Sequence, residues 1–362
     1  MQGSALQGGR PSSGNGVEGA ASVEGQNETM KAIAIEIGSK YGGPVAFVGD
    51  AGYVVGGDGN EIRCWRVNDG KEVGQPMDAG SEVWSIAVSR DGKWIVSGTR
   101  SGQVVVWDAE SREKASVFKG HGRNYVLFAV DISPDATRVA SGSDDKTVRV
   151  WSRSTGQQLL GPFKHDSGVA AVKFSPDGQF IATAATWFCE SVRIYDSHDG
   201  RLLFDCPVKV GSHHNQSLAW VRDSKHLFAL THDGKVHYLD VTNGRILSVW
   251  GIHSNDDPRC LALASNGAFI AASAHSSVSF WDTATHMQIG SLIHHPLAVW
   301  HMAISANDDL VLSHGSKIIL RKLPDILPSS YFDNVGVFRC QRDPIHRDSL
   351  AATDTQSHLS VG

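Results

Sequence analysis

The chain has 362 residues, 41% of them hydrophobic, which excludes wholesale disorder, and no apolar run approaches the length of a membrane-spanning helix. Its 33 basic and 38 acidic side chains give a formal net charge of −5, which excludes the strongly basic footprint of a nucleic-acid-binding protein. The 38 glycines and 10 tryptophans favour a β fold with many tight turns.

Residues 1–29 contain seven glycines and almost no large apolar side chain, a composition typical of a disordered leader. A GxGxxG pattern occurs at residues 14–19, but a dinucleotide site needs a strand before it and a helix after it, and neither is predicted here. The segment lacks the basic region and apolar core of a signal peptide. The five cysteines are scattered, with no CxxC, which favours reduced thiols and a cytoplasmic protein, with a nuclear location left open.

A six-residue phrase recurs seven times along the chain, as EIRCWR, QVVVWD, TVRVWS, SVRIYD, KVHYLD, SVSFWD and KIILRK. Its fifth position holds the anchor residues Trp65, Trp107, Trp151, Tyr195, Leu239, Trp281 and Arg321, which are 42, 44, 44, 44, 42 and 40 residues apart. A second phrase, such as SRDG or SPDG, precedes each anchor by roughly the same distance. Seven copies in register identify an internal repeat.

Each copy predicts short β-strands. An alternating apolar run such as VWSIAVS leads into a turn, and a second run such as WIVSG, a tight turn and the anchor phrase follow. A further turn and a fourth, less regular strand such as RLLFDCP complete the copy. Four strands in about 43 residues correspond to one blade of a β-propeller.

The third copy carries the dipeptide GH at 120–121, SPD at 133–135 and the phrase TVRVW ending at Trp151, and with these motifs the chain resembles the WD-repeat family. The resemblance covers about residues 38–323. It implies an all-β fold, a seven-bladed propeller over residues 30–323, in which residues 30–38 supply the closing outer strand of the last blade. Residues 324–362 are then a C-terminal tail, the first part of which could pack on the outside of the ring while the rest stays mobile.

The resemblance also implies a buried hydrogen-bonded chain of a histidine, a strand hydroxyl, a turn aspartate and the tryptophan indole. The third copy supplies these as His121, Ser141 or Ser143, Asp145 and Trp151, and the sequence does not choose between the two serines. The 17 histidines could alternatively indicate a metal site. Several of them lie 26 to 30 residues before an anchor, which is the family's structural position: His121, His165, His213, His253 and His294.

Propellers of this family generally bind peptides or proteins on the narrower face, through two positions near the start of each innermost strand and one before the turn aspartate. Carried over copy by copy, the predicted protein-binding residues are Tyr41, Asp58, Glu82, Trp84, Arg100, Phe128, Asp144, Phe188, His214, Gln216, His232, Arg259, Trp300 and His314. The register of the third copy stays open, because its innermost strand carries two extra residues. Aromatic and arginine side chains dominate interface hot spots, although some of these rings could instead line seams between blades.

The sequence therefore predicts a non-catalytic interaction scaffold, a monomeric ring within a larger complex, which binds a peptide or loop with an acidic or apolar anchor. The alternative is a small-molecule or metal-binding propeller that uses a histidine-rich channel. No GxxxxGK[ST], HExxH or GxSxG motif occurs, so we expect no catalytic residue, no cofactor and no metal. Neither a nucleic acid nor a membrane is an expected partner.

Overall fold

The computed structural model describes residues 32–40, 42–49, 52–122, 125–185, 191–208, 217–252 and 258–332. The chain divides into two units, Met1–Met30 and Lys31–Gly362, and the description below concerns the second. The predicted leader and the predicted tail from residue 333 onward lie outside the described residues.

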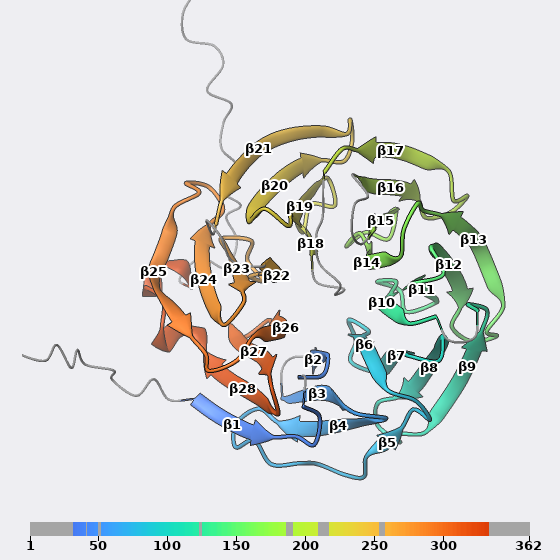
Figure 1. The fold of residues 1–362 in the computed structure, drawn as a ribbon, viewed down its shortest axis with the longest axis horizontal. Helices are drawn as coiled ribbons and strands as arrows, with labels where there is room; N and C mark the ends of the chain where they lie inside the picture. Colours follow the sequence, from blue (N-terminus) through green and yellow to red (C-terminus); the bar gives the residue numbers. More distant parts are fainter. Residues whose placement is uncertain are drawn as a thin grey trace, which may run out of the picture. The chain divides into compact units, whose positions relative to one another are not determined.

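Within these residues, 28 β-strands form seven four-stranded antiparallel sheets, arranged around a common centre (Figure 1). The predicted all-β, seven-bladed propeller is confirmed. The innermost strands are β2 Val45–Val48, β6 Val83–Val88, β10 Leu127–Ile132, β14 Val169–Phe174, β18 Leu218–Trp220, β22 Pro258–Leu263 and β26 Val299–Ile304. The second strands are β3 Tyr53–Asp58, β7 Trp94–Thr99, β11 Arg138–Ser143, β15 Phe180–Ala185, β19 His226–Leu230, β23 Phe269–Ala274 and β27 Asp309–His314.

The third strands carry the anchor residues. They are β4 Glu61–Arg66, β8 Gln103–Asp108, β12 Thr147–Ser152, β16 Val192–Asp196, β20 Lys235–Asp240, β24 Ser277–Asp282 and β28 Lys317–Lys322. The outer strands are β5 Met77–Asp78, β9 Lys114–Lys119, β13 Gln158–Lys164, β17 Leu202–Cys206, β21 Arg245–Gly251, β25 Gln288–His294 and β1 Ala32–Glu36. We number the blades 1 to 7 in the order of their innermost strands.

Blade 7 is built from both ends of the ring. Its outer strand β1 lies within residues 30–38 and pairs antiparallel with β28, from Ala32 opposite Arg321 to Glu36 opposite Lys317. The side chain of Ile35 is buried in the seam that joins blade 7 to blade 1. The start of the ring is therefore held to its end by a β-ladder and by apolar packing.

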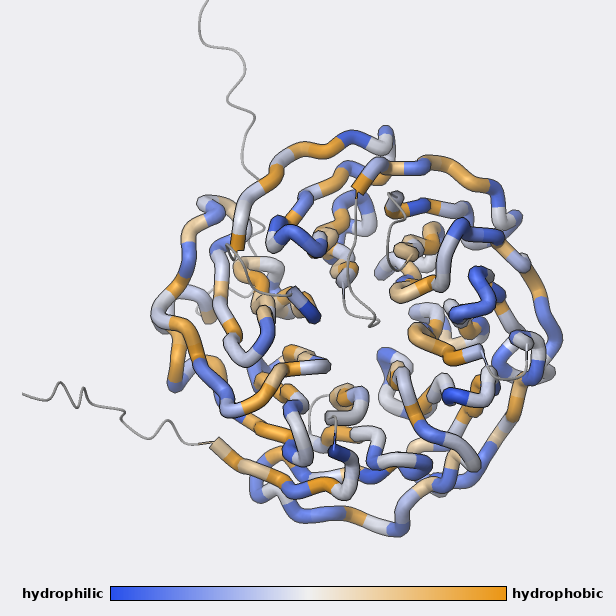
Figure 2. The backbone as a smooth tube through the Cα atoms, in the orientation of Figure 1, coloured by the Kyte–Doolittle hydropathy of each residue, from blue (hydrophilic) through white to orange (hydrophobic). Residues whose placement is uncertain are grey.

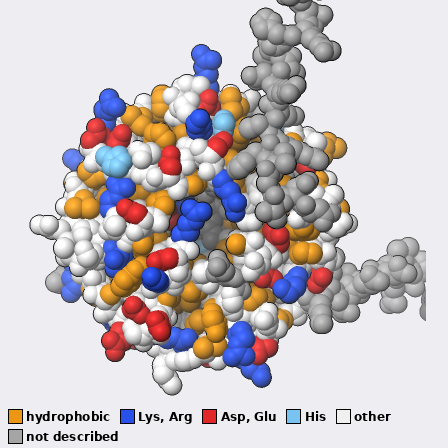
Figure 3. Space-filling model, turned by 180° about the vertical axis from the view of Figure 1, so that it is seen from behind, with side chains coloured by type: hydrophobic (Ala, Val, Ile, Leu, Met, Phe, Trp, Pro, Cys, Tyr) orange, Lys and Arg blue, Asp and Glu red, His pale blue; other side chains and the backbone are white. Residues whose placement is uncertain are grey.

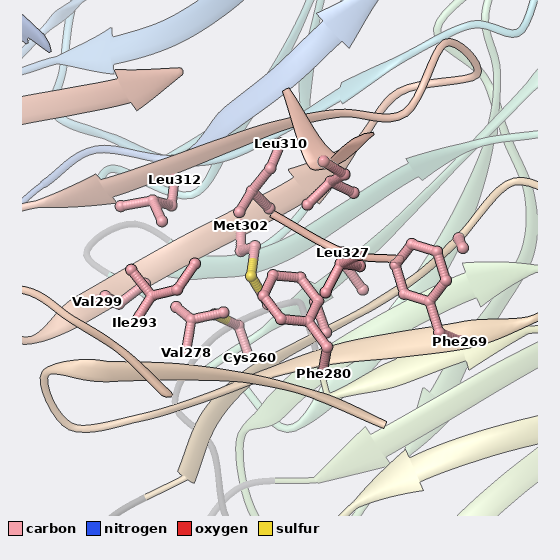
Figure 4. Close-up of a cluster of buried hydrophobic side chains, with 14 of the residues drawn as sticks. Cys260, Phe269, Val278, Phe280, Ile293, Val299, Met302, Leu310, Leu312 and Leu327 are labelled. Carbon is pink, nitrogen blue, oxygen red and sulfur yellow. The ribbon is translucent and has the colours of Figure 1, made fainter. Parts of the chain in front are cut away.

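The core is divided among the seams between neighbouring blades. Seven clusters of buried apolar side chains are found in the described residues, and each one joins two adjacent blades. The hydrophobic stretches of the backbone accordingly follow the strands (Figure 2). In the seam between blades 6 and 7, Phe280, Met302 and Leu310 pack together (Figure 4). Because a single sheet cannot bury both of its faces, the ring is stable only as a closed stack.

The chain continues beyond blade 7 into two 3₁₀ helices, η1 Leu323–Asp325 and η2 Ser329–Tyr331. Leu327 joins the core between blades 6 and 7 (Figure 4). The Tyr331 hydroxyl donates to Asp282 Oδ2 at 3.0 Å, and Asn266 Nδ2 donates to the Tyr331 carbonyl at 2.7 Å. The first nine residues of the predicted tail thus pack on the ring. None of the helices in the described residues is long and apolar enough to cross a membrane.

Candidate partner-binding face

Five of the innermost strands share a β-bulge at the same place. In β6, for example, Val83 pairs with Thr99 and Ser85 with Gly98, so that Trp84 between them has no opposite residue. A bulge kinks the strand locally and re-aims the side chain of the extra residue. The five bulge residues are Trp84, Phe128, Ala170, Arg259 and Trp300. All five lie at the same end of their sheets, and we call this side of the ring the bulge face.

Four of the five bulge residues belong to the predicted protein-binding set, and the structure brings them together in pairs. The Trp84 and Phe128 rings, from blades 2 and 3, have centres 5.9 Å apart and planes inclined by 63°. The Arg259 guanidinium carbon, from blade 6, lies 4.0 Å from the centre of the Trp300 ring in blade 7. All four side chains are partly exposed, although their neighbours in the strands, such as Val83 and Ser85, are buried.

Two other predicted binding residues form an ion pair at the rim of the bulge face. Arg100 Nη1 lies 3.1 Å from Glu82 Oε2, and the Arg100 side chain is 66% exposed and that of Glu82 40% exposed. An exposed pair of this kind contributes about 0–1 kcal/mol to stability, so it can exchange with charges on a partner. Asp144 and His232 are also exposed.

Asp58 and His314 are less available than the sequence suggests. Asp58 Oδ1 accepts a hydrogen bond from the Ser39 backbone at 2.6 Å, and its Oδ2 lies 3.2 Å from Arg63 Nε. His314 is only 3% exposed, and its ring centre lies 5.1 Å from that of His295. Four further predicted binding residues lie outside the described residues, namely Tyr41, Phe188, His214 and Gln216.

The four predicted members of the hydrogen-bonded chain are connected in blade 3. His121 Nδ1 lies 2.8 Å from Asp145 Oδ2, and its Nε2 lies 2.7 Å from Ser141 Oγ. The Trp151 indole donates to the same Ser141 oxygen at 2.9 Å. Ser143 Oγ instead accepts from the Asp145 backbone amide at 3.1 Å. Ser141 is therefore the hydroxyl in this chain, and we call His121, Ser141, Asp145 and Trp151 the blade 3 network.

Comparison with known proteins agrees with this architecture. The family model "WD domain, G-beta repeat" matches residues 74–108, 112–152 and 157–196, and the third matched segment ends at Asp196, the last residue of β16. The same strand order occurs in all seven sheets, including those that the family model does not match.

Three segments of the chain are thus WD repeats, and all seven sheets share their architecture.

Several WD-repeat relatives resemble parts of the chain. Eukaryotic translation initiation factor 3 subunit I of Neurospora crassa is 27% identical over 48% of this chain and 51% of its own length. Nuclear distribution protein nudF of Emericella nidulans is 30% identical over 39% of this chain and 36% of its own length. Small ribosomal subunit protein RACK1y of Oryza sativa subsp. japonica is 30% identical over 41% of this chain and 44% of its own length. The chain thus spans about half or less of these relatives.

The structure also corrects one assignment of the WD-repeat histidine. Before blade 4, the backbone amide of His165 donates to the carbonyl of Lys146, the residue that precedes β12. Before blade 7, the backbone amide of His295 donates to the carbonyl of Ser276, the residue that precedes β24, so His295 is the equivalent of His165. His295 is buried, whereas His294 is exposed at the end of β25. The spacing from the anchor does not separate the two, because both His294 and His295 lie within the range of 26 to 30 residues. His213 and His253 lie outside the described residues.

The alternative prediction, a metal or small-molecule site, can be compared with the described residues. In the part of the chain that the structure describes, no group of three or more His, Cys, Asp or Glu residues is placed to hold a metal ion. A cavity of about 220 Å³ lies between blades 1 and 2, beside the two-residue outer strand β5. Its lining includes Val55, Cys64 and Ile95, and no predicted site residue.

The opposite view of the ring shows how charge is distributed on one face. Lys, Arg, Asp and Glu side chains are interspersed with hydrophobic ones, and no field of a single sign covers the surface (Figure 3). A mixed surface suits a protein partner better than a nucleic acid, which needs a continuous basic stripe.

Proposed function

We propose that this WD-repeat protein is a non-catalytic interaction module that binds an extended peptide or loop of a partner protein on the bulge face. The shared β-bulge carries the proposal, since Trp84, Phe128, Arg259 and Trp300 are partly exposed at the bulge although the residues on both sides of each one are buried. Tryptophan and arginine are the residue types that contribute most to binding energy at interfaces.

The position of the two pairs fits an extended ligand. The strands β6 and β10, which carry Trp84 and Phe128, lie across the centre of the ring from β22 and β26, which carry Arg259 and Trp300 (Figure 1). A peptide that crosses the centre would contact both pairs at once. Two separate anchor points fix the direction and register of a ligand better than one.

We further propose that the ring works as a monomer within a larger complex in the cytoplasm. Two of the similar proteins, the initiation factor subunit and the ribosomal subunit protein, are named as parts of assemblies. The described cysteines Cys64, Cys206 and Cys260 are buried and free, in keeping with a reducing compartment.

The test is affinity purification of the full chain followed by quantitative mass spectrometry. The double variant Trp84→Ala, Trp300→Ala should lose at least nine-tenths of the specifically captured partner. A matched double variant on the outer rim, Val117→Ala, Met287→Ala, removes exposed apolar groups away from the bulge face and should retain it. The captured protein is then purified and its affinity for each variant measured by calorimetry. Equal affinity for the wild type and the bulge-face variant would refute the proposal.

A further inference from the structure

The two pairs on the bulge face differ in one respect. Between blades 6 and 7, the bulge residue of the earlier blade is Arg259, and it covers the Trp300 ring of the next blade. Between blades 2 and 3, the equivalent positions hold Trp84 and Phe128. One pair therefore consists of a cation on an aromatic ring, and the other of two aromatic rings.

Among the described residues, the aromatic pair has no cation of its own. Within this part of the chain, Lys or Arg groups lie over the rings of Trp107, Phe174, Trp94 and Trp300, and neither the Trp84 nor the Phe128 ring is among them. Each of these two residues is partly exposed, and their rings meet edge to face at an inclination of 63°. We call the angle between the two rings the corner.

Such a corner has the chemistry of a cation site. The face of an aromatic ring is negative because of its quadrupole, and it attracts an ammonium or guanidinium group placed over it. Two carboxylates belong to the segments that adjoin these strands. Glu82 lies two residues before Trp84 and forms an ion pair with Arg100. Asp144 is exposed, and its backbone amide donates a hydrogen bond to the carbonyl of Val126, which lies two residues before Phe128.

We infer that the corner formed by Trp84 and Phe128 binds a cationic side chain, arginine or lysine, of the partner. The partner's cation takes the place over the aromatic ring that Arg259 occupies over Trp300 in the other pair. This inference rests on the proposed function, since the corner is part of the same face. It adds that the ligand carries a basic residue at one anchor point.

The test uses ¹⁹F NMR of the full chain labelled with 5-fluorotryptophan. The signals of Trp84 and Trp300 are assigned with Trp84→Phe and Trp300→Phe. The probe is tetramethylammonium chloride, compared with tert-butyl alcohol, which has nearly the same size and no charge, and with sodium chloride at equal ionic strength. The Trp84 signal should shift saturably with tetramethylammonium alone. Phe128→Leu should weaken this response about 3- to 30-fold by removing one wall.

Trp300 provides the matched control. In the wild type its signal should not respond to tetramethylammonium, because Arg259 already covers the ring. Arg259→Ala should expose the ring and make the Trp300 signal respond. An equal response of Trp84 to the neutral alcohol, or no response to the cation, would overturn the inference. The proposed function would survive that result, because it fails only if the loss of Trp84 and Trp300 leaves partner affinity unchanged.

Discussion

His121 Nδ1 lies 2.8 Å from Asp145 Oδ2, which ties the segment before β10 to the turn between β11 and β12. Because an ionised carboxylate only accepts hydrogen bonds, the imidazole carries its proton on Nδ1, and Nε2 accepts from Ser141. Burial alone would raise the pKa of the Asp145 carboxyl, but hydrogen bonds from His121 and Thr147 outweigh it and lower the pKa to about 2. One carboxylate thus fixes both the tautomer and the position of the histidine.

Asp145→Asn should destabilise the protein by about 1–3 kcal/mol, because the amide nitrogen replaces one of the two oxygens and places a donor opposite either His121 or Thr147, which bond different oxygens. Urea unfolding at pH 7 measures the loss. Since the folded pKa is below the unfolded value of about 3.9, the wild-type carboxylate stabilises the fold above about pH 4, and this contribution disappears as the pH falls toward 2. The variant should lack that step. Asp144→Asn, at the exposed neighbour, is the control, and a loss below about 0.5 kcal/mol in Asp145→Asn would contradict the prediction.

Gly120→Ala should also be costly, for a steric reason. A Cβ added at Gly120 would lie 2.0 Å from Trp151 Cη2, and the indole cannot retreat because its nitrogen is bonded to Ser141. Overpacking of this kind costs about 1–3 kcal/mol. Thermal unfolding should show a lower midpoint, and Gly251→Ala, where the added Cβ meets nothing within 4 Å, should not. A normal midpoint for Gly120→Ala would mean that the ring of Trp151 moves freely.

Ile35→Ala tests the closure of the ring. The side chain is 7% exposed and packs in the seam between blades 7 and 1, so truncation should cost about 2–4 kcal/mol. Hydrogen exchange should rise in β1 and β28 together, because the two strands share a ladder. Ala34→Ser, one residue away on the exposed side of β1, should change neither quantity. If both variants unfolded alike, β1 would not be holding blade 7 to blade 1.

Tyr331→Phe tests the contact between η2 and blade 6. The change removes the hydroxyl that donates to Asp282 but keeps the ring, whose centre lies 6.0 Å from that of Phe269. We expect a loss of about 0.5–1.5 kcal/mol and faster hydrogen exchange in residues 323–332. Exchange in blade 3 serves as the internal reference and should stay unchanged. An unaltered exchange rate in η1 and η2 would show that the Tyr331 hydroxyl does not help to hold this segment, since the bond from Asn266 to the Tyr331 carbonyl remains in the variant.

Much of the fold could be predicted because the repeat is periodic. The anchors recur every 40 to 44 residues, and once Trp151 is recognised as lying on the third strand of a blade, the equivalent strands of the other copies follow. Irregular elements could not be predicted in this way. Tyr331 lies beyond the last repeat, and its contact with Asp282 of the sixth copy joins residues 49 positions apart, which no local pattern signals.

The candidate site was predictable in composition but not in geometry. The alignment of copies selects Trp84 and Trp300, yet strict alternation along a strand cannot show that both are bulge residues. In β6 and β26 the structure buries the residues on both sides of the tryptophan, an arrangement that alternation does not predict. The pairing of Arg259 with Trp300 depends on the distance between blades, which the sequence of one blade does not contain.

Blade 7 should make the protein sensitive to mild acid. Burial lowers the pKa of His301 to about 4, although hydrogen bonds to the backbone of Gly42 and Gly43 act in the opposite direction. Burial, followed by the charges of His314, Arg321 and His294, lowers the pKa of His295 to about 4. In the unfolded chain each histidine titrates near 6.5, so the unfolded state binds more protons between pH 6.5 and pH 4.

The free energy of unfolding should therefore fall as the pH drops from 6.5 to 4. Between pH 7 and pH 5, each of these two histidines should account for a loss of about 2 kcal/mol. Below pH 4 these groups should add no further loss. Urea unfolding at pH 7 and pH 5 measures the difference. His295→Gln should reduce it by about that amount, because glutamine does not titrate. His232→Gln, which removes an exposed histidine and leaves the buried ones in place, should not. If His295→Gln unfolded with the wild-type pH dependence, protonation of blade 7 would not limit the stability of the ring in acid.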